Sequence, residues 1–293
     1  MSSPVATVLV PTFDHGPLVR LALESVLAQT VSEIEVFLVG DGVPDVTREI
    51  AAELAERDAR LRFFDNPKGP RHGEIHRHAA LGEAQGLIVL YLADDDLWLP
   101  DHVETMRTAL ADADFATAAS LAVLPGGEVQ VKGNDFGRPS TRQAFLDGGA
   151  GISLSVLGHT LAAYRRLPEG WTTTPADFPT DRYFWERFVS DPDLRGAGTS
   201  RVTALGFASP ARAQLAPAER LAEMTLWWDR VSDPEGRAEI HAAAFASTYG
   251  RAARLAAKLE RAQRHRAKLE AKLEKALLPS RRRLVRRLRL RKR

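Results

Sequence analysis

Residues 91–100 read Tyr-Leu-Ala-Asp-Asp-Asp-Leu-Trp-Leu-Pro, and the three acids at positions 94–96 follow directly on an apolar run that begins at Leu87. The run predicts a buried strand, so the acids belong to the loop where that strand ends. Three adjacent carboxylates repel one another unless a cation relieves them, and hard oxygen ligands suit Mg²⁺ or Mn²⁺. We therefore expect a divalent-metal site here, with a helix N-terminus opened by Pro100 as the alternative.

Before this loop, short apolar runs alternate with amphipathic helical patterns. The runs cover 5–10, 34–39, 61–64 and 87–92, and the helical patterns cover 18–29, 45–57 and 74–85. This alternation predicts βα units and a mostly parallel sheet flanked by helices. Ligands bind beyond the carboxyl ends of such strands, so we expect a site built from 11–16, 40–42 and 93–96. These segments contain neither a dinucleotide-binding glycine motif nor a P-loop.

The pattern changes after Pro100. A helix over 101–110 precedes two strands, 115–123 and 128–132, which flank a Pro-Gly-Gly turn and predict an antiparallel edge. We expect one α/β domain over 1–210, with a ligand-binding half (1–100) and a second half (101–210). A helical region over 211–250, a coiled-coil-like helix over 251–278 and a basic tail over 279–293 complete the predicted organisation.

The coiled-coil prediction rests on alternating spacings of four and three residues. Leu255, Leu259, Ala262, Arg266, Leu269, Leu273 and Ala276 form this seam. The seam predicts a weak homodimer, with folding back on the body as the alternative. Pro279 is expected to end the helix, and the tail beyond it is either a solvated basic segment or an amphipathic helix on an anionic membrane.

Composition excludes collagen, disordered polymers and disulfide-stapled secreted modules, since 44% of the 293 residues are hydrophobic and none is cysteine. The small net charge hides an asymmetry. Residues 251–293 carry 18 Lys+Arg against three Glu, whereas residues 1–250 carry 22 Lys+Arg against 35 Asp+Glu. The acidic body, and a tail without aromatic residues for base stacking, argue against nucleic acid as the main partner.

Targeting signals are not apparent. The longest apolar stretch, 87–93, is far shorter than the ~20 residues of a membrane span, and residues 1–30 lack a charged start before an apolar core. We therefore expect a cytoplasmic protein, peripheral at the inner membrane face if the tail binds anionic lipid.

Four segments resemble the family-2 glycosyltransferases with the GT-A fold. They read VLVPTF at 8–13, ALESVLAQT at 22–30, EVFLVGDG at 35–42 and LADDDLW at 92–98, in the family's order and spacing. The resemblance covers about residues 5–105. It implies an α/β nucleotide-diphospho-sugar transferase fold with a mostly parallel sheet flanked by helices, to which this chain adds a helical C-terminal extension.

The resemblance also implies roles for individual residues on the donor side. Asp94 and Asp96 match the Asp-x-Asp element as metal ligands for Mn²⁺ or Mg²⁺, and Asp95 is able to exchange roles with either. Gly40 and His78 depart from the family pattern. The residues that match the donor-binding positions are Pro11, Thr12, Phe13, Asp41, Arg77, Asp94 and Asp95.

On the acceptor side, Asp181 matches the acid that serves as general base in the inverting enzymes of the family. Its alternative is a helix cap. His159 and Trp185 are candidates for the acceptor side, with a satisfied histidine at a strand start and burial in the core as the alternatives.

Together these residues predict an inverting, metal-assisted glycosyltransferase. It would move a sugar from a nucleotide-diphosphate donor to a hydroxyl of a glycan or other acceptor. The alternative is a catalytically silent nucleotide-sugar-binding or scaffold protein on the same fold.

Overall fold

The computed structural model describes residues 3–149 and 151–290, with side chains except at position 275 and positions 277–290. Two compact units divide the chain, the first ending at Ala244 and the second beginning at Phe245. The first unit contains a nine-stranded sheet in the order β3-β2-β1-β4-β8-β6-β9-β5, with β7 paired to β6. The strands are β1 (Ala6–Thr12), β2 (Ile34–Asp41), β3 (Leu61–Asn66), β4 (Ile88–Tyr91), β5 (Leu97–Trp98), β6 (Phe115–Val123), β7 (Val129–Lys132), β8 (Leu157–Thr160) and β9 (Gly196–Gly206).

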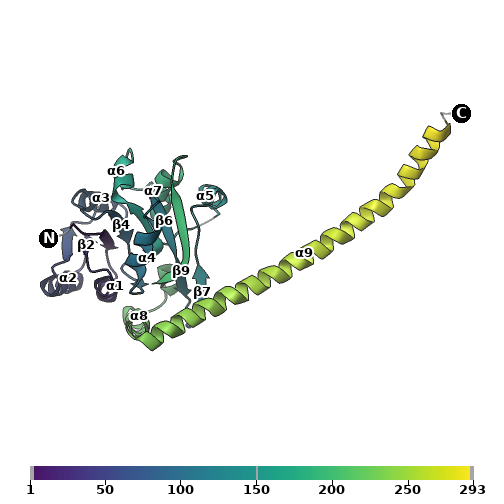
Figure 1. Cartoon of the computed structure of the whole chain (residues 1–293). Helices are drawn as coiled ribbons and strands as arrows, with labels where there is room; N and C mark the ends of the chain where they lie inside the picture. The colour runs from purple at the N-terminus through teal and green to yellow at the C-terminus, as the bar shows by residue number, and fades with distance from the viewer. Residues whose placement is uncertain (1–2, 150, 291–293) are drawn as a thin grey trace. The chain divides into compact units, whose positions relative to one another are not determined.

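Helices cover both faces of this sheet, with α1 and α2 on one side and α3 and α6 on the other (Figure 1). Two 3₁₀ helices, η1 (Leu154–Val156) and η2 (Ser209–Arg212), lie in loops of the second half. The α-helices are α1 (Leu18–Leu27), α2 (Asp45–Arg57), α3 (Glu74–Gly82), α4 (His102–Ala109), α5 (Pro139–Leu146), α6 (Leu161–Arg166), α7 (Thr180–Val189), α8 (Pro217–Ser232) and α9 (Pro234–Leu290).

The parallel half of the sheet confirms the predicted βα alternation. Val8 on β1 pairs in parallel with Val36 on β2 and with Leu90 on β4. The carboxyl ends of these strands therefore meet at one edge of the sheet, where the predicted site residues follow them. The predicted hairpin is also present, since β6 and β7 pair antiparallel around the Pro-Gly-Gly turn.

The strand that the alternative interpretation of His159 implied joins the two halves. β8 lies between β4 and β6 and is antiparallel to both. Gly158 on β8 lies opposite Leu90, where an added Cβ would come 2.4 Å from the Leu90 side chain. The segment that precedes β8 is therefore held next to the acidic loop, because the acidic loop directly follows β4.

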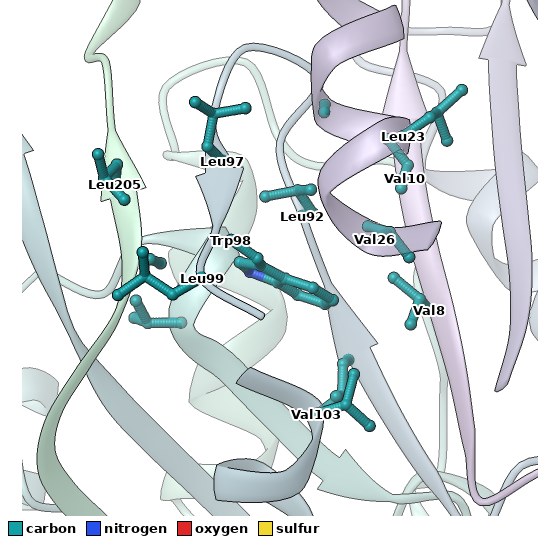
Figure 2. Packing of buried hydrophobic residues seen from close by; sticks show 14 of the residues in the cluster. Val8, Val10, Leu23, Val26, Leu92, Leu97, Trp98, Leu99, Val103 and Leu205 are labelled. Carbon is teal, nitrogen blue, oxygen red and sulfur yellow. The ribbon is translucent and has the colours of Figure 1, made fainter. Parts of the chain in front are cut away.

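The sheet separates two apolar cores. Successive side chains of a strand point to opposite faces of the sheet, so Val8 and Val10 on β1 belong to one core and Leu9 to the other. Trp98 is fully buried in the first core, among side chains of α1, α4 and the strands (Figure 2). Its Nε1 donates a hydrogen bond to the carbonyl of Ser155 at 2.7 Å. This contact anchors the segment that follows the three acids.

The helices after residue 210 pack on the same body. Met224 and Trp227 of α8, with Ile240 and Ala244 of α9, are buried against the first core. The predicted boundary at residue 210 therefore falls inside the first unit, because these apolar side chains complete its core.

In the second unit, α9 runs on from Phe245. The prediction that Pro279 ends the helix is wrong, because α9 extends to Leu290. A proline removes one backbone hydrogen bond from a helix, and the residues on both sides of Pro279 remain helical. The side chains of the predicted basic tail lie outside those described. No helix in the described part of the chain combines the length and the apolar character needed to cross a membrane.

Candidate active site

A cavity of about 990 Å³ opens at the carboxyl ends of β1, β2 and β4. Its floor comes from the loops that follow these strands, and its opposite wall comes from α7 and the loop after α5. The structure thus brings together all but two of the predicted site residues. Those that line the cavity are Pro11, Thr12, Phe13, Asp41, Arg77, Asp94, Asp95, Asp181 and Trp185.

The acidic loop forms a compact cluster with a histidine from the loop after β1. Nδ1 of His15 lies 2.6 Å from Oδ1 of Asp94. The hydrogen bond to Asp94 raises the pKa of His15 to about 9 against the opposing effect of burial. His15 is therefore a cation at neutral pH and donates to the carboxylate.

Asp95 is held by a second cation. Its Oδ2 accepts hydrogen bonds from Ser209 Oγ at 2.5 Å and from Arg220 Nη2 at 2.8 Å. Burial raises the pKa of Asp95, and the charge of Asp94 adds to this effect. Two cations of the chain, His15 and Arg220, therefore face the acidic loop.

The cluster is a candidate divalent-metal site. One ligand-type atom from each of His15, Asp94 and Asp95 lies within 4.8 Å of the others. Oδ2 of Asp94 is buried and has no hydrogen-bond partner in the described part of the chain. The two carboxylates supply the oxygen ligands that Mn²⁺ and Mg²⁺ prefer, and the imidazole nitrogen of His15 becomes a third ligand atom only after it releases its proton.

Both carboxylate oxygens of Asp96, which was predicted to be a metal ligand, are engaged with the protein in this structure. Its Oδ2 accepts from Ser155 Oγ at 2.5 Å, and its Oδ1 accepts from the backbone N–H of Phe207 at 2.8 Å. Burial first, and then the charge of Asp95, raise the pKa of Asp96 to about 7. Asp95 and Asp96 both line a second cavity of about 480 Å³, and of these two only Asp95 also lines the first.

At the other end of the cavity, Asp41 is enclosed by the loop after β3. Lys68 Nζ and the backbone N–H of Gly69 each donate to its carboxylate at 2.6 Å. Gly73 has a φ of 67°, and a Cβ at this position would lie 2.8 Å from the Cβ of Asp41. Glycine is required there because the backbone approaches the acid so closely.

Two further donor-side residues from β1 and its loop reach this end of the cavity. Thr12 Oγ1 is buried without a hydrogen-bond partner among the described residues. The ring of Phe13 is 44% exposed, and Lys68 Nζ lies 4.9 Å from its centroid. An exposed ring beside an unsatisfied hydroxyl is a surface on which a planar polar ligand can stack.

The departures at Gly40 and His78 have physical explanations. A Cβ at Gly40 would come 3.1 Å from the side chain of Phe63 and 3.2 Å from that of Val43. Packing thus leaves little room for an acid at this position. His78 lines a separate cavity of about 450 Å³, where its Nδ1 lies 2.7 Å from the hydroxyl of Tyr164.

Asp181 lies in the first turn of α7, on the cavity wall opposite the loops that follow β1, β2 and β4. The N-cap residue of this helix is Pro179, and no side chain caps it. The alternative that Asp181 is a helix cap is therefore not supported. Burial raises the pKa of Asp181, while the positive charge of Arg77 opposes this effect.

Of the two acceptor-side candidates, only Trp185 lines the cavity. It is fully buried, and its Nε1 has no hydrogen-bond partner in the part of the chain that the structure describes. The expectation that His159 faces the acceptor is wrong. His159 is fully buried on β8, where Nε2 lies 2.8 Å from the hydroxyl of Tyr91, and burial lowers its pKa to about 4.

Sequence reasoning missed four residues that contact the acidic loop. His15 lies inside the segment 11–16 that was expected to contribute to the site, so its position after β1 was an available signal. Ser155, Ser209 and Arg220 approach from segments far along the chain. No local pattern distinguishes them from other serines and arginines.

The model for glycosyl transferase family 2 matches residues 7–168, which is more than half of the chain. The chain belongs to this family. The match begins in β1 and ends just after α6, so it includes the acidic loop and the strands that carry the donor end of the cavity.

Curated relatives of this family-2 chain match it over part of its length. The uncharacterized glycosyltransferase EpsJ of Bacillus subtilis is 34% identical over 93 residues, or 32% of this chain and 26% of EpsJ. The GalNAc(5)-diNAcBac-PP-undecaprenol beta-1,3-glucosyltransferase of Campylobacter jejuni is 28% identical over 103 residues, or 35% of this chain and 33% of that enzyme. The matched segment thus spans about a third or less of these relatives.

Solved structures show that this family-2 chain has the GT-A fold. S. aureus TarS 1-349 in complex with UDP-GlcNAc matches 69% of this chain and 58% of its own, with a TM-score of 0.56 and 16% identity. The mannosyltransferase PcManGT from Pyrobaculum calidifontis, in complex with GDP-Man and Mn²⁺, matches 83% of this chain and 69% of its own, with a TM-score of 0.50 and 18% identity.

Proposed function

We propose that this protein is an inverting glycosyltransferase that moves a sugar from a nucleotide-diphosphate donor to a hydroxyl of a glycan or other acceptor. One observation carries the proposal: the cluster of His15, Asp94 and Asp95 and the half-buried acid Asp181 line opposite parts of one cavity in a member of family 2. Two structural relatives were solved with a nucleotide sugar, UDP-GlcNAc for TarS and GDP-Man for PcManGT.

The donor nucleotide is proposed to occupy the end of the cavity at Asp41. Phe13 offers an exposed ring for the base, and the unsatisfied hydroxyl of Thr12 offers a hydrogen bond to base or ribose. Pro11 lines the same end and presents no backbone N–H. A buried polar atom without a partner costs free energy, so a ligand that satisfies Thr12 gains this energy on binding.

The diphosphate is proposed to lie at the acidic loop. Asp94, Asp95 and the neutral form of His15 would hold Mn²⁺ or Mg²⁺ there. When bound, such an ion supplies a Lewis acid that neutralises the charge developing on the departing diphosphate. Arg220 keeps Asp95 in place through its hydrogen bond, and Ser209, which itself accepts a hydrogen bond from Arg220, donates to the same carboxylate oxygen.

Asp181 is proposed to be the general base. The acceptor oxygen forms a bond to the anomeric carbon, the bond from that carbon to the diphosphate oxygen breaks, and the hydroxyl proton passes to the Asp181 carboxylate. A single displacement inverts the anomeric configuration and needs no second carboxylate as nucleophile. Burial raises the pKa of Asp181, which makes it a stronger base than an exposed aspartate. Trp185, which is fully buried, is proposed to support the cavity wall on the acceptor side from within the core.

A binding and turnover series tests this proposal. The full chain is titrated with UDP and GDP, with and without Mn²⁺, and nucleotide sugars are then screened by thermal shift. Turnover is read as release of the nucleotide diphosphate. Asp181→Asn should lower turnover by about 10²–10⁴-fold with unchanged nucleotide binding. Asp65→Asn, an equal change at an exposed position on β3, serves as the control.

The outcomes separate the enzyme from its alternative. Nucleotide binding with no turnover, and no change in Asp181→Asn, would support a catalytically silent nucleotide-sugar-binding protein on the same fold. Failure of the wild-type chain to bind any nucleotide with Mn²⁺ present would contradict both.

We propose that the second unit pairs two copies of the chain. The seam leucines of α9 are exposed, with Leu255 at 56%, Leu259 at 60%, Leu269 at 51% and Leu273 at 61%. Their seven-residue period matches a left-handed coiled coil rather than the 3.6-residue period of a straight helix on a flat surface. Arg266, the charged seam position, is paired within its own helix to Glu270 at 2.8 Å.

The tail from residue 279 is proposed to place the enzyme at an anionic membrane surface.

A further inference from the structure

The start of α7 is tied to one face of α3 by two neighbouring contacts. Glu74 Oε1 accepts hydrogen bonds from Thr180 Oγ1 at 3.4 Å and from the backbone N–H of Thr174 at 3.3 Å. One turn further along α3, Arg77 Nη1 lies 3.7 Å from Oδ1 of Asp181. Residues 74 and 77 share a helix face, and residues 180 and 181 are the first two of α7. Helix α3 therefore fixes where α7 begins.

Arg77 is an unusual cation because it is buried and only partly satisfied. Its exposed fraction is 7%, and its guanidinium carbon lies 4.7 Å from the centroid of the Trp171 ring. Nη2 donates to the carbonyl of His72 at 3.2 Å, whereas Nε and Nη1 have no hydrogen-bond partner among the residues described. A buried charge of this kind is costly without an anion nearby, and Asp181 is the acid with which it forms an ion pair.

We infer that Arg77 is a positioning residue for Asp181, whose guanidinium orients the carboxylate of the proposed base and holds it in its ionised form. The inference rests on the proposed function and deepens it. It gives Arg77 a different role from the contact with the donor diphosphate that the family resemblance implies. Arg77 lies on α3 in the first half of the domain, whereas Asp181 lies on α7 in the second half.

The other charges around Asp181 do not replace Arg77. His72, in the loop before α3, adds a weaker positive influence that lowers the pKa of Asp181, and Glu74 raises it. On α7 itself, Arg182 is turned toward the carbonyls of Phe145 and Leu146 and toward Glu186. Tyr91 on β4 stays neutral, because burial raises its pKa well above the ordinary value. Arg77 is the largest single influence that opposes the effect of burial on Asp181.

The test measures the ionisation of Asp181 directly. The full chain is labelled with ¹³C at aspartate carboxyls, and the Asp181 signal is assigned by its loss in Asp181→Asn. Titration midpoints are then compared among the wild type, Arg77→Met and Arg77→Lys. Arg71→Met is the matched control, since Arg71 lines the same cavity and the change removes the same charge. Circular dichroism establishes that each variant is folded.

We expect the Asp181 midpoint to rise in Arg77→Met, to stay near the wild-type value in Arg77→Lys, and to be unmoved in Arg71→Met. Affinity for UDP with Mn²⁺ should be unchanged in Arg77→Met, because the guanidinium is engaged with Asp181. An Asp181 midpoint that is the same in all variants would overturn the inference. A loss of about tenfold in UDP affinity in Arg77→Met, with an unchanged Asp181 midpoint, would also overturn the inference. It would indicate that Arg77 contacts the donor diphosphate instead.

The two proposals fail in different ways. The Asp181 midpoint decides the role of Arg77 whether or not UDP is the right nucleotide. The absence of any nucleotide binding by the wild-type chain counts against the proposed function alone.

Discussion

Arg220 on α8 donates a hydrogen bond from Nη2 to Oδ2 of Asp95 at 2.8 Å, across 125 residues of chain. The two side chains are 16% and 10% exposed, so the pair is largely removed from water. A helix after the family-matched region thus supplies a counter-charge to the acidic loop. The loop is held by the chain's own cations, which a divalent ion would supplement or displace.

Arg220→Met should destabilise the metal-free protein by about 3 kcal/mol, because it leaves a buried carboxylate without its cation. Mn²⁺ should recover much of this loss, since the ion neutralises the same acid. Thermal unfolding with and without Mn²⁺ measures both effects. Arg220→Lys retains the charge and is the control. An equal Mn²⁺-induced shift in the wild type and in Arg220→Met would contradict the prediction.

His15 should make stability depend on pH. Its pKa is raised to about 9 in the folded chain from an ordinary value of 6.5, so its contribution is complete below pH 6.5 and is lost as pH rises through about 9. Urea unfolding of the metal-free protein from about pH 6 to about pH 10 should show this decline. His15→Asn should flatten the profile over that interval. A decline of the same size in the variant would show that another group is responsible.

Substitution of Asp96 should lower the stability of the protein, whereas substitution of Asp94 should weaken Mn²⁺ binding. Asp96→Asn should lower stability by about 1–3 kcal/mol, because an amide cannot accept both hydrogen bonds from Ser155 and Phe207. Asp94→Asn should instead weaken Mn²⁺ binding, since the unpartnered oxygen of Asp94 is lost as a ligand. It also removes the charged partner of His15, so its loss of stability should be confined to pH values below about 9. Calorimetric titration and urea unfolding of both variants test this pair. A larger loss of Mn²⁺ affinity in Asp96→Asn would restore the assignment made from sequence.

A charge in the seam of α9 should separate two copies of the chain. Leu269→Glu places a carboxylate in the apolar seam and should shift the protein to monomer in sedimentation equilibrium. Ala271→Glu, on the same exposed helix but outside the seam, should leave the association unchanged. A wild-type chain that is monomeric at all concentrations would rule out the homodimer.

Removal of residues 279–293 should abolish binding to vesicles that contain anionic lipid, because it deletes nine basic residues. The affinity of the full chain should fall with added salt. Nucleotide binding should be unaffected by the deletion. Equal binding of the shortened chain to anionic and neutral vesicles, at the level of the full chain, would show that the tail is not the contact.

Local sequence determined the parallel half of the sheet and the donor end of the cavity. Apolar runs of four to six residues followed by short polar loops define strands whose ends must meet at one edge, because parallel neighbours run in the same direction. For this reason Thr12, Asp41 and Asp94 were predicted together and lie together. The order of these segments also carried the family resemblance, which the match over residues 7–168 confirms.

The tertiary structure alone decided which acids of the triplet face the cavity and which cations meet them. Asp94, Asp95 and Asp96 have the same chemistry and adjacent positions, so no local pattern separates them; the hydroxyl of Ser155 and the N–H of Phe207 turn Asp96 away. Arg220 and Ser209 arrive from more than 110 residues further along the chain. Contacts between residues so far apart in the chain depend on how the two halves of the sheet pack. A single sequence contains these residues but does not show that packing.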